Sequence, residues 1–327
     1  MMTEIQGIQE VLQLMKRVKT NINRVVIGKE QVIDQLLIAM VCSGHVLLED
    51  VPGTGKTLLA KTLAKSLACD FKRIQFTPDL LPTDLSGINF YNQKLSEFEF
   101  RPGPVFTNIL LADEINRATP RTQASMLECM EERQVSIDGE THRLAQPFLV
   151  IATQNPLENQ GTFPLPEAQL DRFLIKIRMG YPTAVESMDI LKRFKNANPL
   201  DTLEAEATAA DIVKAQNGYS TVYVSDPVLQ YMIDLAEQTR RHPDIATGIS
   251  PRGLQALLKA AQAHAILRER AYASPDDVKA MIQPVWGHRI WMKGGSRNRD
   301  ELAGKTLGQI VAGTPVPAEE ALIGKEA

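Results

Sequence analysis

The chain has 327 residues, a formal net charge of −3 and an isoelectric point near 6.0. This length is enough for two domains with well-buried cores, so stability does not require disulfides. The net negative charge gives no overall attraction for nucleic acid. Apolar runs such as 44–48 and 147–152 are too short to span a membrane.

The three cysteines, Cys42, Cys69 and Cys129, are scattered and form no CxxC pair. Such spacing is typical of a reducing compartment and speaks against a zinc site. The N-terminus lacks the basic and apolar blocks of a secretory signal. We therefore expect a cytoplasmic protein.

The first half of the chain alternates between helical and strand-like patterns. An amphipathic helix is predicted over 4–22, and a second helical pattern follows Gly28 and stops at Ser43–Gly44. Short apolar runs that read as strands are 45–49, 71–76, 108–113, 148–153 and 173–178. This alternation predicts a parallel sheet covered by helices on both faces.

Two segments interrupt this frame, and a helical region follows it. Residues 134–144 carry Asp138–Gly139 between two alternating runs, which predicts a hairpin, and an aromatic insertion is expected over 88–104. The helices predicted after the sheet are 184–196, 226–241, 251–272 and 275–286. We therefore expect an α/β core over residues 1–181 and a helical domain with a C-terminal tail over residues 182–327.

The stretch "LLEDVPGTGKTLLA" at 47–60 contains most of the phosphate-loop pattern GxxxxGK[ST], with Asp50 where the first glycine belongs. The strand before it, the helix after it and the intact PGTGKT core support a phosphate-binding loop. Gly53 and Gly55 would bring backbone N–H groups close to the anion, whereas position 50 only begins the turn. We therefore expect the Asp50 carboxylate to point away from the ligand and to accept backbone hydrogen bonds.

Polar residues also end the neighbouring strands. "NILLADEINRA" places Asp113 at the carboxyl end of a strand and Glu114 one residue further on. With Thr57, Asp113 can hold Mg²⁺, and Glu114 can polarise an attacking water, a role worth about 10²–10⁴ in rate. Asn155 ends the next strand, where a neutral amide can hold the water and the γ-phosphate. Taken alone, each of these is also a common turn pattern.

Five motifs in order resemble the AAA+ ATPases: PGTGKT at 52–57, LLADE at 110–114, TQN at 153–155, LPEAQLDRF at 165–173 and SPRG at 250–253. DEINRA, QNP, PLPEAQLDRF and GTPVP are similar to the MoxR branch of that class. The resemblance runs from about residue 20 to residue 317. It implies an α/β fold, an AAA+ P-loop NTPase core with a parallel sheet and a C-terminal helical lid.

The resemblance also assigns roles to single residues. Arg172 of LDRF would be the arginine finger that reaches a neighbouring subunit's nucleotide, although without the resemblance it would read as a surface ion pair. Arg252 of SPRG would be the second sensor, reaching from the lid to the γ-phosphate of an ATP held between loop and lid. Asn155 would match the first sensor. The residues expected to bind ATP are Val26, Ile27, Gly28, Pro52, Gly53, Thr54, Gly55, Lys56, Thr57, Leu58, Asp113 and Arg252, with Lys56 on the β- and γ-phosphates and Thr57 and Asp113 on Mg²⁺.

We therefore expect a Mg²⁺-dependent ATPase that assembles into a ring, most simply a hexamer. The resemblance further implies chaperone-like remodelling or maturation of a client protein, together with a partner that carries a von Willebrand A-type domain. The two insertions would touch the client. A nucleic-acid motor and a non-hydrolysing nucleotide switch remain alternatives. Arg117 and Arg121 face either an adjoining subunit or solvent, and the sequence does not show the role of residues 293–327.

Overall fold

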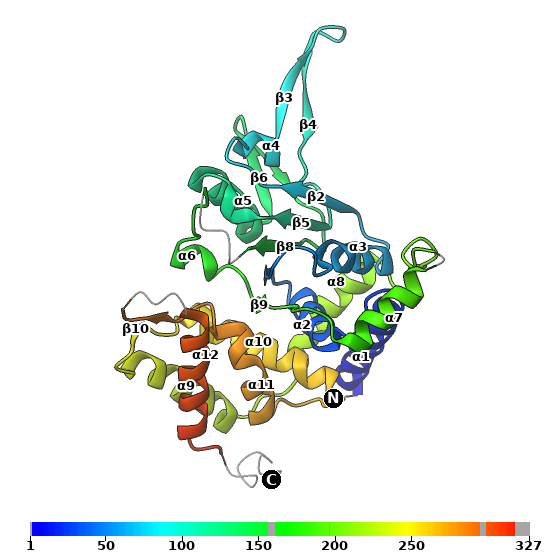
Figure 1. Cartoon of the computed structure of the whole chain (residues 1–327). Coiled ribbons are helices and arrows are strands. Elements are labelled where there is room, and N and C mark those ends of the chain that lie inside the picture. Colours follow the sequence, from blue (N-terminus) through cyan, green and yellow to red (C-terminus); the bar gives the residue numbers. More distant parts are fainter. Residues whose placement is uncertain (1, 156–160, 196, 295–298, 318–327) are drawn as a thin grey trace.

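The structure, a computed structural model, describes residues 2–155, 161–195, 197–294 and 299–317. Its centre is a five-stranded parallel sheet in the strand order β2-β5-β8-β1-β9 (Figure 1). The strands are β1 (Val46–Glu49), β2 (Phe71–Gln75), β5 (Ile109–Asp113), β8 (Leu149–Gln154) and β9 (Ile175–Ile177). Each lies within two residues of a predicted strand, so the predicted parallel sheet is confirmed.

Both faces of the central strands β1, β5 and β8 are buried, because alternating side chains of each enter two separate apolar clusters. Val46 and Leu48 pack into one cluster, and Leu47, between them, packs into the other. The first cluster includes helices α1 (Met2–Asn23), α2 (Glu30–Val41) and α3 (Lys56–Ser66), and the second includes α5 (Pro120–Glu132). This burial on both sides fixes the strand ends, where the polar site residues lie.

The chain after the sheet is helical, as predicted. Its helices are α7 (Ala184–Phe194), α8 (Ala209–Gly218), α9 (Asp226–Arg241), α10 (Pro251–Leu267), α11 (Pro275–Trp286) and α12 (Arg299–Gly313). The sequence patterns did not predict α8 and α12. One apolar cluster runs from α1 and α2 into α10 and α11, so the boundary at residue 181 stays a proposal. No helix among the described residues is long and apolar enough to cross a membrane.

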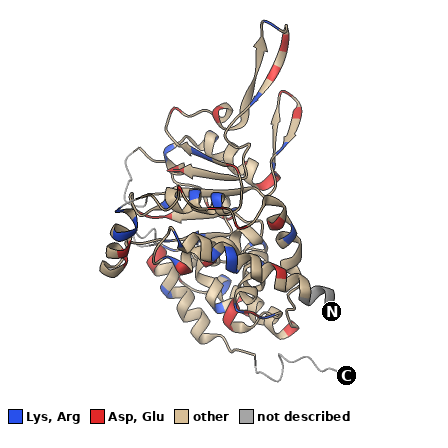
Figure 2. Ribbon diagram, turned by 90° about the vertical axis from the view of Figure 1, so that its right-hand side faces the viewer, with Lys and Arg blue, Asp and Glu red and all other residues tan. Residues whose placement is uncertain are grey.

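Two hairpins occupy the segments predicted as insertions. They are formed by β3 (Gly87–Asn92) with β4 (Glu97–Pro102), and by β6 (Gln134–Ile137) with β7 (Glu140–Arg143). Both project from the same end of the molecule (Figure 2), and Asn89 Nδ2 donates a hydrogen bond to Asp138 Oδ2 at 2.9 Å. A Cβ on Gly87 would lie 2.2 Å from Arg101 O, so the root of the longer hairpin requires glycine.

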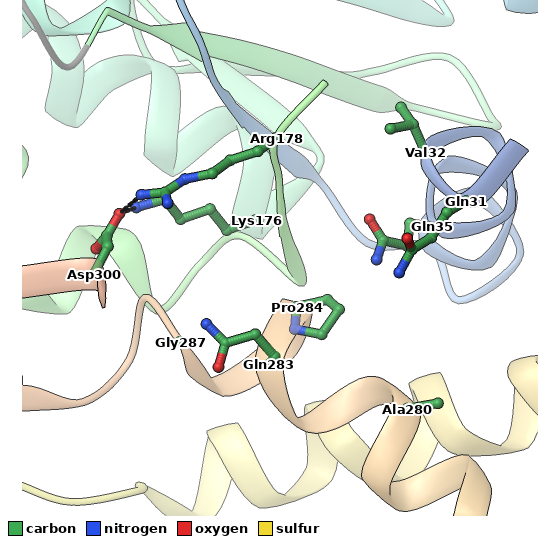
Figure 3. Close-up of a pocket in the computed structure, with 10 residues that line it drawn as sticks. All are labelled: Gln31, Val32, Gln35, Lys176, Arg178, Ala280, Gln283, Pro284, Gly287 and Asp300. Carbon is green, nitrogen blue, oxygen red and sulfur yellow. Dashed lines mark hydrogen bonds and ion pairs between the residues drawn. The ribbon is translucent and has the colours of Figure 1, made fainter. Parts of the chain in front are cut away.

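A charged cluster joins α12 to the sheet. Lys176 and Arg178, in and just after β9, both pair with Asp300 of α12 (Figure 3). Each of the two cations also lies 2.7 Å from the carboxylate of Glu49, the last residue of β1. A cavity of about 270 Å³ lies beside the cluster, with Gln31, Gln35 and Gln283 among its lining residues. Because Glu49 directly precedes the glycine loop, the cluster connects α12 to the base of that loop.

Candidate nucleotide-binding site

The glycine loop lies between β1 and α3, at the carboxyl edge of the sheet. Gly53 and Gly55 have φ angles of +85° and +93°, a region that residues with a side chain rarely adopt. Pro52 and Gly53 are exposed, and a Cβ on Gly53 would meet no atom within 4 Å, so the loop is open at this point. Lys56 and Thr57 begin α3, where backbone N–H groups lack intrahelical partners. This geometry suits an anion at a helix N-terminus.

The structure confirms that the Asp50 carboxylate accepts backbone hydrogen bonds. Its Oδ1 accepts from Val51 N at 2.8 Å, and its Oδ2 accepts from Gly180 N at 2.7 Å. Only 9% of the residue is exposed. The aspartate therefore replaces the first glycine of the motif by tying the start of the loop to the segment that follows β9.

The segment predicted to contact adenine, Val26–Gly28, lies near the same region. Lys29, which follows it, donates from Nζ to Met179 O at 2.7 Å. The Cε atom of Met179 is 4.0 Å from the position of a Cβ on Gly55. Met179 thus lies between this segment and the glycine loop, and the adenine contact itself stays a prediction.

The polar side chains of the loop are bound to its own backbone. Lys56 Nζ donates to Asp50 O at 2.8 Å and to Val51 O at 3.1 Å, and Thr54 Oγ1 lies 3.3 Å from Val51 O. A phosphate would offer Lys56 a charged acceptor in place of two carbonyl oxygens, which makes a stronger hydrogen bond. Leu58 packs its side chain against the apolar core, which leaves its backbone for the predicted ligand contact.

Asp113, at the end of β5, is held by two neighbouring side chains. Its Oδ1 accepts from Thr153 Oγ1 at 2.6 Å, and its Oδ2 accepts from Arg73 at 2.5 Å for Nη2 and 3.1 Å for Nε. Thr153 Oγ1 also accepts from the backbone N–H of Glu114 at 2.8 Å. The threonine on β8 therefore fixes both carboxyl-bearing residues, while Arg73 occupies the other oxygen of Asp113.

Glu114 has a left-handed backbone, with φ of +57°, which is uncommon for a residue with a side chain. Its Oε2 accepts from Gln75 Nε2 at 2.6 Å and lies 2.9 Å from Arg117 Nε. Arg117 therefore contacts a carboxylate of its own chain, and Arg121 is exposed on α5. The structure thus holds both strand-end carboxylates in hydrogen bonds within one chain.

Arg73 and Gln75 were not predicted as site residues. Both lie on β2, two residues apart and so on one face of the strand, and Arg73 Nη2 donates to Gln75 Oε1 at 3.0 Å. Gln75 stands opposite Asp113 in the register of β2 and β5. The alternation of polar residues in "FKRIQF" is the available signal, but it becomes meaningful only once β2 is known to adjoin β5.

Asn155 completes this edge of the sheet. It follows β8 directly and is 7% exposed, and Asp50 N donates to the preceding Gln154 O at 3.1 Å. The edge therefore combines an open glycine loop, the helix-start residue Thr57 and the carboxylate of Asp113. Hydroxyl and carboxylate oxygens are suitable ligands for Mg²⁺, and the loop is suited to a triphosphate, so the residues present fit both groups.

Arg172 and Arg252 lie together on one carboxylate, that of Glu131 in the last turn of α5. Arg172 Nε is 2.8 Å from Glu131 Oε2, and Arg252 Nη1 is 2.9 Å from Glu131 Oε1. They line a cavity of about 280 Å³ together with residues that precede β1, among them His45. Burial and the charge of Arg133 lower the pKa of His45 to about 3, so this histidine is neutral and adds no charge to the cavity.

This placement bears on the predicted role of Arg252. The cavity lies at the amino ends of the strands, whereas the glycine loop follows the carboxyl end of β1, and the strand alone spans about 13 Å. In this structure Arg252 lies on Glu131, away from the glycine loop of its own chain, and its contact with the γ-phosphate stays a prediction. Arg172 shares the same edge, as an arginine that acts on a neighbouring subunit requires.

Known protein families match both the sheet region and the helical region of the chain. The family described as "ATPase family associated with various cellular activities (AAA)" matches residues 45–175, and the "AAA lid domain" matches residues 237–305. A crystal structure of a putative ATPase from Cytophaga hutchinsonii is 37% identical, with a TM-score of 0.87, and the match covers 96% of this chain and 98% of that one.

Several curated relatives carry the family name MoxR. Chaperone MoxR1 of Mycobacterium tuberculosis is 40% identical over 294 residues, covering 87% of this chain and 78% of that protein. Protein MoxR of Paracoccus denitrificans is 35% identical, with 91% and 94% covered. Uncharacterized protein YeaC of Bacillus subtilis is 45% identical, with 96% and 98% covered.

The parallel sheet, the glycine loop with its strand-end carboxylates and the C-terminal helical lid together define an AAA+ fold. Proteins of this class bind nucleotides and generally assemble into oligomers. Within it, the similarity to MoxR proteins over most of the chain is decisive: the chain belongs to the MoxR family of AAA+ ATPases.

Proposed function

We propose that the protein hydrolyses ATP with Mg²⁺ in a ring, most simply a hexamer, whose active sites are each shared by two subunits. The glycine-loop edge of one subunit binds the nucleotide, and Arg172 and Arg252 of the next subunit complete the site. The observation that carries this proposal is the position of both arginines on Glu131, at the sheet edge opposite the loop. A closed ring of head-to-tail contacts brings these two edges together.

At the nucleotide edge, Lys56 then binds the β- and γ-phosphates, and Thr57 and Asp113 bind Mg²⁺. Glu114 polarises the attacking water, and Asn155 holds this water and the γ-phosphate. When bound, Mg²⁺ neutralises charge on the phosphates. In the structure, Gln75 and Arg117 both contact Oε2 of Glu114 and so reduce its strength as a base towards water. These contacts support a resting arrangement in which the isolated chain hydrolyses ATP slowly.

The task of the ring that we propose is chaperone-like remodelling or maturation of a client protein. The name Chaperone MoxR1, carried by one relative, supports this task. The projecting hairpins β3–β4 and β6–β7 are the proposed client contacts, and a von Willebrand A-domain protein is the proposed partner, on the strength of the MoxR resemblance. The three free cysteines support the cytosolic location.

The experiment that tests hydrolysis compares the wild type with Glu114→Gln. We expect turnover to fall by about 10²–10⁴, because the amide cannot accept the proton of the attacking water, while ATP binding is retained. The measurements are phosphate release and the binding of a fluorescent ATP analogue. In addition, wild-type turnover per subunit should rise with protein concentration, because the arginines act between subunits.

Unchanged phosphate release by Glu114→Gln, with ATP still bound, would instead indicate a non-hydrolysing nucleotide switch. The same variant, which holds ATP without hydrolysing it, serves as bait in a pull-down. Recovery of a protein client supports the chaperone-like task. Recovery of nucleic acid, together with hydrolysis that DNA stimulates in a strongly salt-dependent way, would support the motor alternative.

A further inference from the structure

We propose that Glu131 is a positioning residue that holds Arg172 and Arg252 as a single two-arginine clamp for the triphosphate bound by the neighbouring subunit. The inference deepens the proposed function and rests on it. Each arginine contacts a different oxygen of the same carboxylate, at 2.8 Å and 2.9 Å. The guanidinium groups are therefore held side by side, although one comes from the sheet domain and the other from the lid.

This arrangement leaves both arginines able to bind a further anion. Arg172 uses Nε and Arg252 uses Nη1 for Glu131, and a guanidinium carries additional N–H groups in a planar fork. The side chains of Arg172 and Arg252 remain 28% and 44% exposed. A phosphate can thus meet N–H groups of both residues while the contacts to Glu131 persist.

The charge around the pair also favours an anion. Lining the cavity of about 280 Å³ are the cationic residues Arg133, Arg172, Arg252, Lys259 and Arg289 and the carboxylates Glu131 and Asp171. Arg133 donates hydrogen bonds to the backbone oxygens of Ser43 and Phe148, and these contacts stabilise the fold. The excess of positive charge explains why a carboxylate is needed to keep two guanidinium groups together, since like charges otherwise repel.

A buried arginine fixes the base of the clamp. Arg289 is 8% exposed, and its Nε donates to Asp171 Oδ1 at 2.7 Å, next to Arg172 in the chain. Its Nη2 donates to Phe173 O at 2.6 Å. Burial lowers the pKa of Arg289 to about 10 against the opposing effect of Asp171, so it stays a cation at neutral pH.

The lid side of the clamp is also attached to Asp171. Ser250 caps α10, with its Oγ accepting from Gly253 N at 3.0 Å, and lies 3.4 Å from Asp171 Oδ2. Arg252 stands in the first turn of the helix that Ser250 caps. Arg172 and Arg252 therefore project from one rigid junction between the sheet domain and the lid, and Glu131 sets their spacing.

The test uses the full-length protein with Glu131→Gln, which keeps the shape of the side chain and removes its charge. We expect kcat to fall at least tenfold while KM for ATP stays within twofold, because the glycine loop that binds ATP is untouched. Glu131→Asp, which keeps the charge, should recover part of kcat. The matched control is Glu132→Gln, an exposed residue of the same helical turn, which should behave as wild type.

A double-mutant cycle adds a readout that a merely structural role would not move. In the wild-type background, Arg172→Ala and Arg252→Ala should each remove most of the activity, so that the double variant loses little more. In the Glu131→Gln background, Arg172→Ala and Arg252→Ala should lower the activity independently, so that the double variant shows the product of the two separate effects. Sedimentation and thermal unfolding of each variant establish that the ring and the fold are intact.

The outcomes separate the clamp from the proposed function. If Arg172→Ala and Arg252→Ala leave hydrolysis unchanged, the shared active site is wrong. If they abolish hydrolysis but Glu131→Gln has wild-type kcat and coupling, only the clamp is wrong. The clamp is also contradicted if Glu131→Gln changes KM as much as kcat. The same holds if the kcat of Glu131→Asp is no higher than that of Glu131→Gln.

Discussion

Arg73 binds the carboxylate that we propose for Mg²⁺. The Arg73 guanidinium contacts Asp113 Oδ2, and the Arg73 side chain is 47% exposed, so the pair is partly screened by water. An exposed ion pair of this kind is worth about 1 kcal/mol or less, which corresponds to roughly a fivefold change in an equilibrium constant. We therefore expect Arg73 and Mg²⁺ to compete for this oxygen.

We expect Arg73→Gln to lower the Mg²⁺ concentration that half-saturates binding of a fluorescent ATP analogue, by about twofold to fivefold. The reason is that the glutamine amide does not neutralise Asp113. Titrating Mg²⁺ at fixed analogue measures the effect without relying on turnover. Lys72→Gln, at the neighbouring position of β2, is the control. An unchanged or raised half-saturation point in Arg73→Gln would show that the arginine does not compete with the metal.

The role of a residue was predictable where it follows from the local backbone, and it was not predictable where it depends on the order of the strands in the sheet. Asp50 was predicted correctly, because its role follows from the turn in which it lies. Arg73 and Glu131 were missed, because their partners lie far away in sequence and become neighbours only through packing. Arg252 was predicted at a helix start, as the structure shows, but its contact with Glu131 was not predicted, because a motif does not show which sheet edge the lid adjoins.

At the scale of elements, the central strands β1, β5 and β8 were predictable because both of their faces are buried and each is a nearly continuous apolar run. Helices α8 and α12 were missed for different local reasons. Helix α8 is short and begins after an Ala-, Glu- and Thr-rich connection, with a capping box of Thr208 and Asp211. Helix α12 contains several glycines and begins near a Gly-rich stretch, so its apolar residues give a weak pattern.

The helix pair α10 and α11 is joined by a buried carboxylate, which makes lid stability dependent on pH. Burial raises the pKa of Asp277, but hydrogen bonds from His264, Arg270 and the backbone of Ser274 outweigh it and lower the pKa to about 2. The unfolded chain would titrate near pH 4. The ionised carboxylate therefore stabilises the fold fully above about pH 4, and this contribution is lost as pH falls towards 2.

We expect Asp277→Asn to lower the free energy of unfolding at pH 7 by about 3 kcal/mol, because it leaves Arg270 without its anionic partner. The variant should also lose less stability than the wild type when pH falls from 5 to 3. Urea unfolding followed by circular dichroism at several pH values measures both effects. Asp276→Asn is the control, since the Asp276 side chain is 86% exposed and pairs with the surface residue Lys279 at 3.3 Å. Equal pH dependence in wild type and Asp277→Asn would contradict this account.

At the scale of the whole molecule, the glycine loop and the two arginines lie at opposite ends of the strands. The proposed function therefore divides one active site into two halves, and a single chain would hold two incomplete sites. This division leads to an experiment on mixed rings. Lys56→Ala damages only the first half, and Arg172→Ala damages only the second.

Each of these two variants should be inactive alone, and a mixture should recover up to roughly a quarter of wild-type turnover, the fraction of random head-to-tail contacts that combine two intact halves. Phosphate release after subunit exchange measures this recovery. A mixture of Lys56→Ala with Glu114→Gln, which damage the same half, should stay inactive. If the first mixture also stays inactive although mixed rings form, the halves do not belong to different subunits.

The rigid root of the β3–β4 hairpin turns it into a lever. A Cβ at Gly87 or Gly103 would lie 2.2 Å or 2.1 Å from a backbone oxygen, so the two strands leave the body at a fixed angle. Strands of six residues make an arm about 20 Å long. The arm begins shortly after β2, the strand that carries Arg73 and Gln75. A small tilt of the arm at its root would therefore be magnified at its far end, where Leu95 and Phe98 are 58% and 72% exposed.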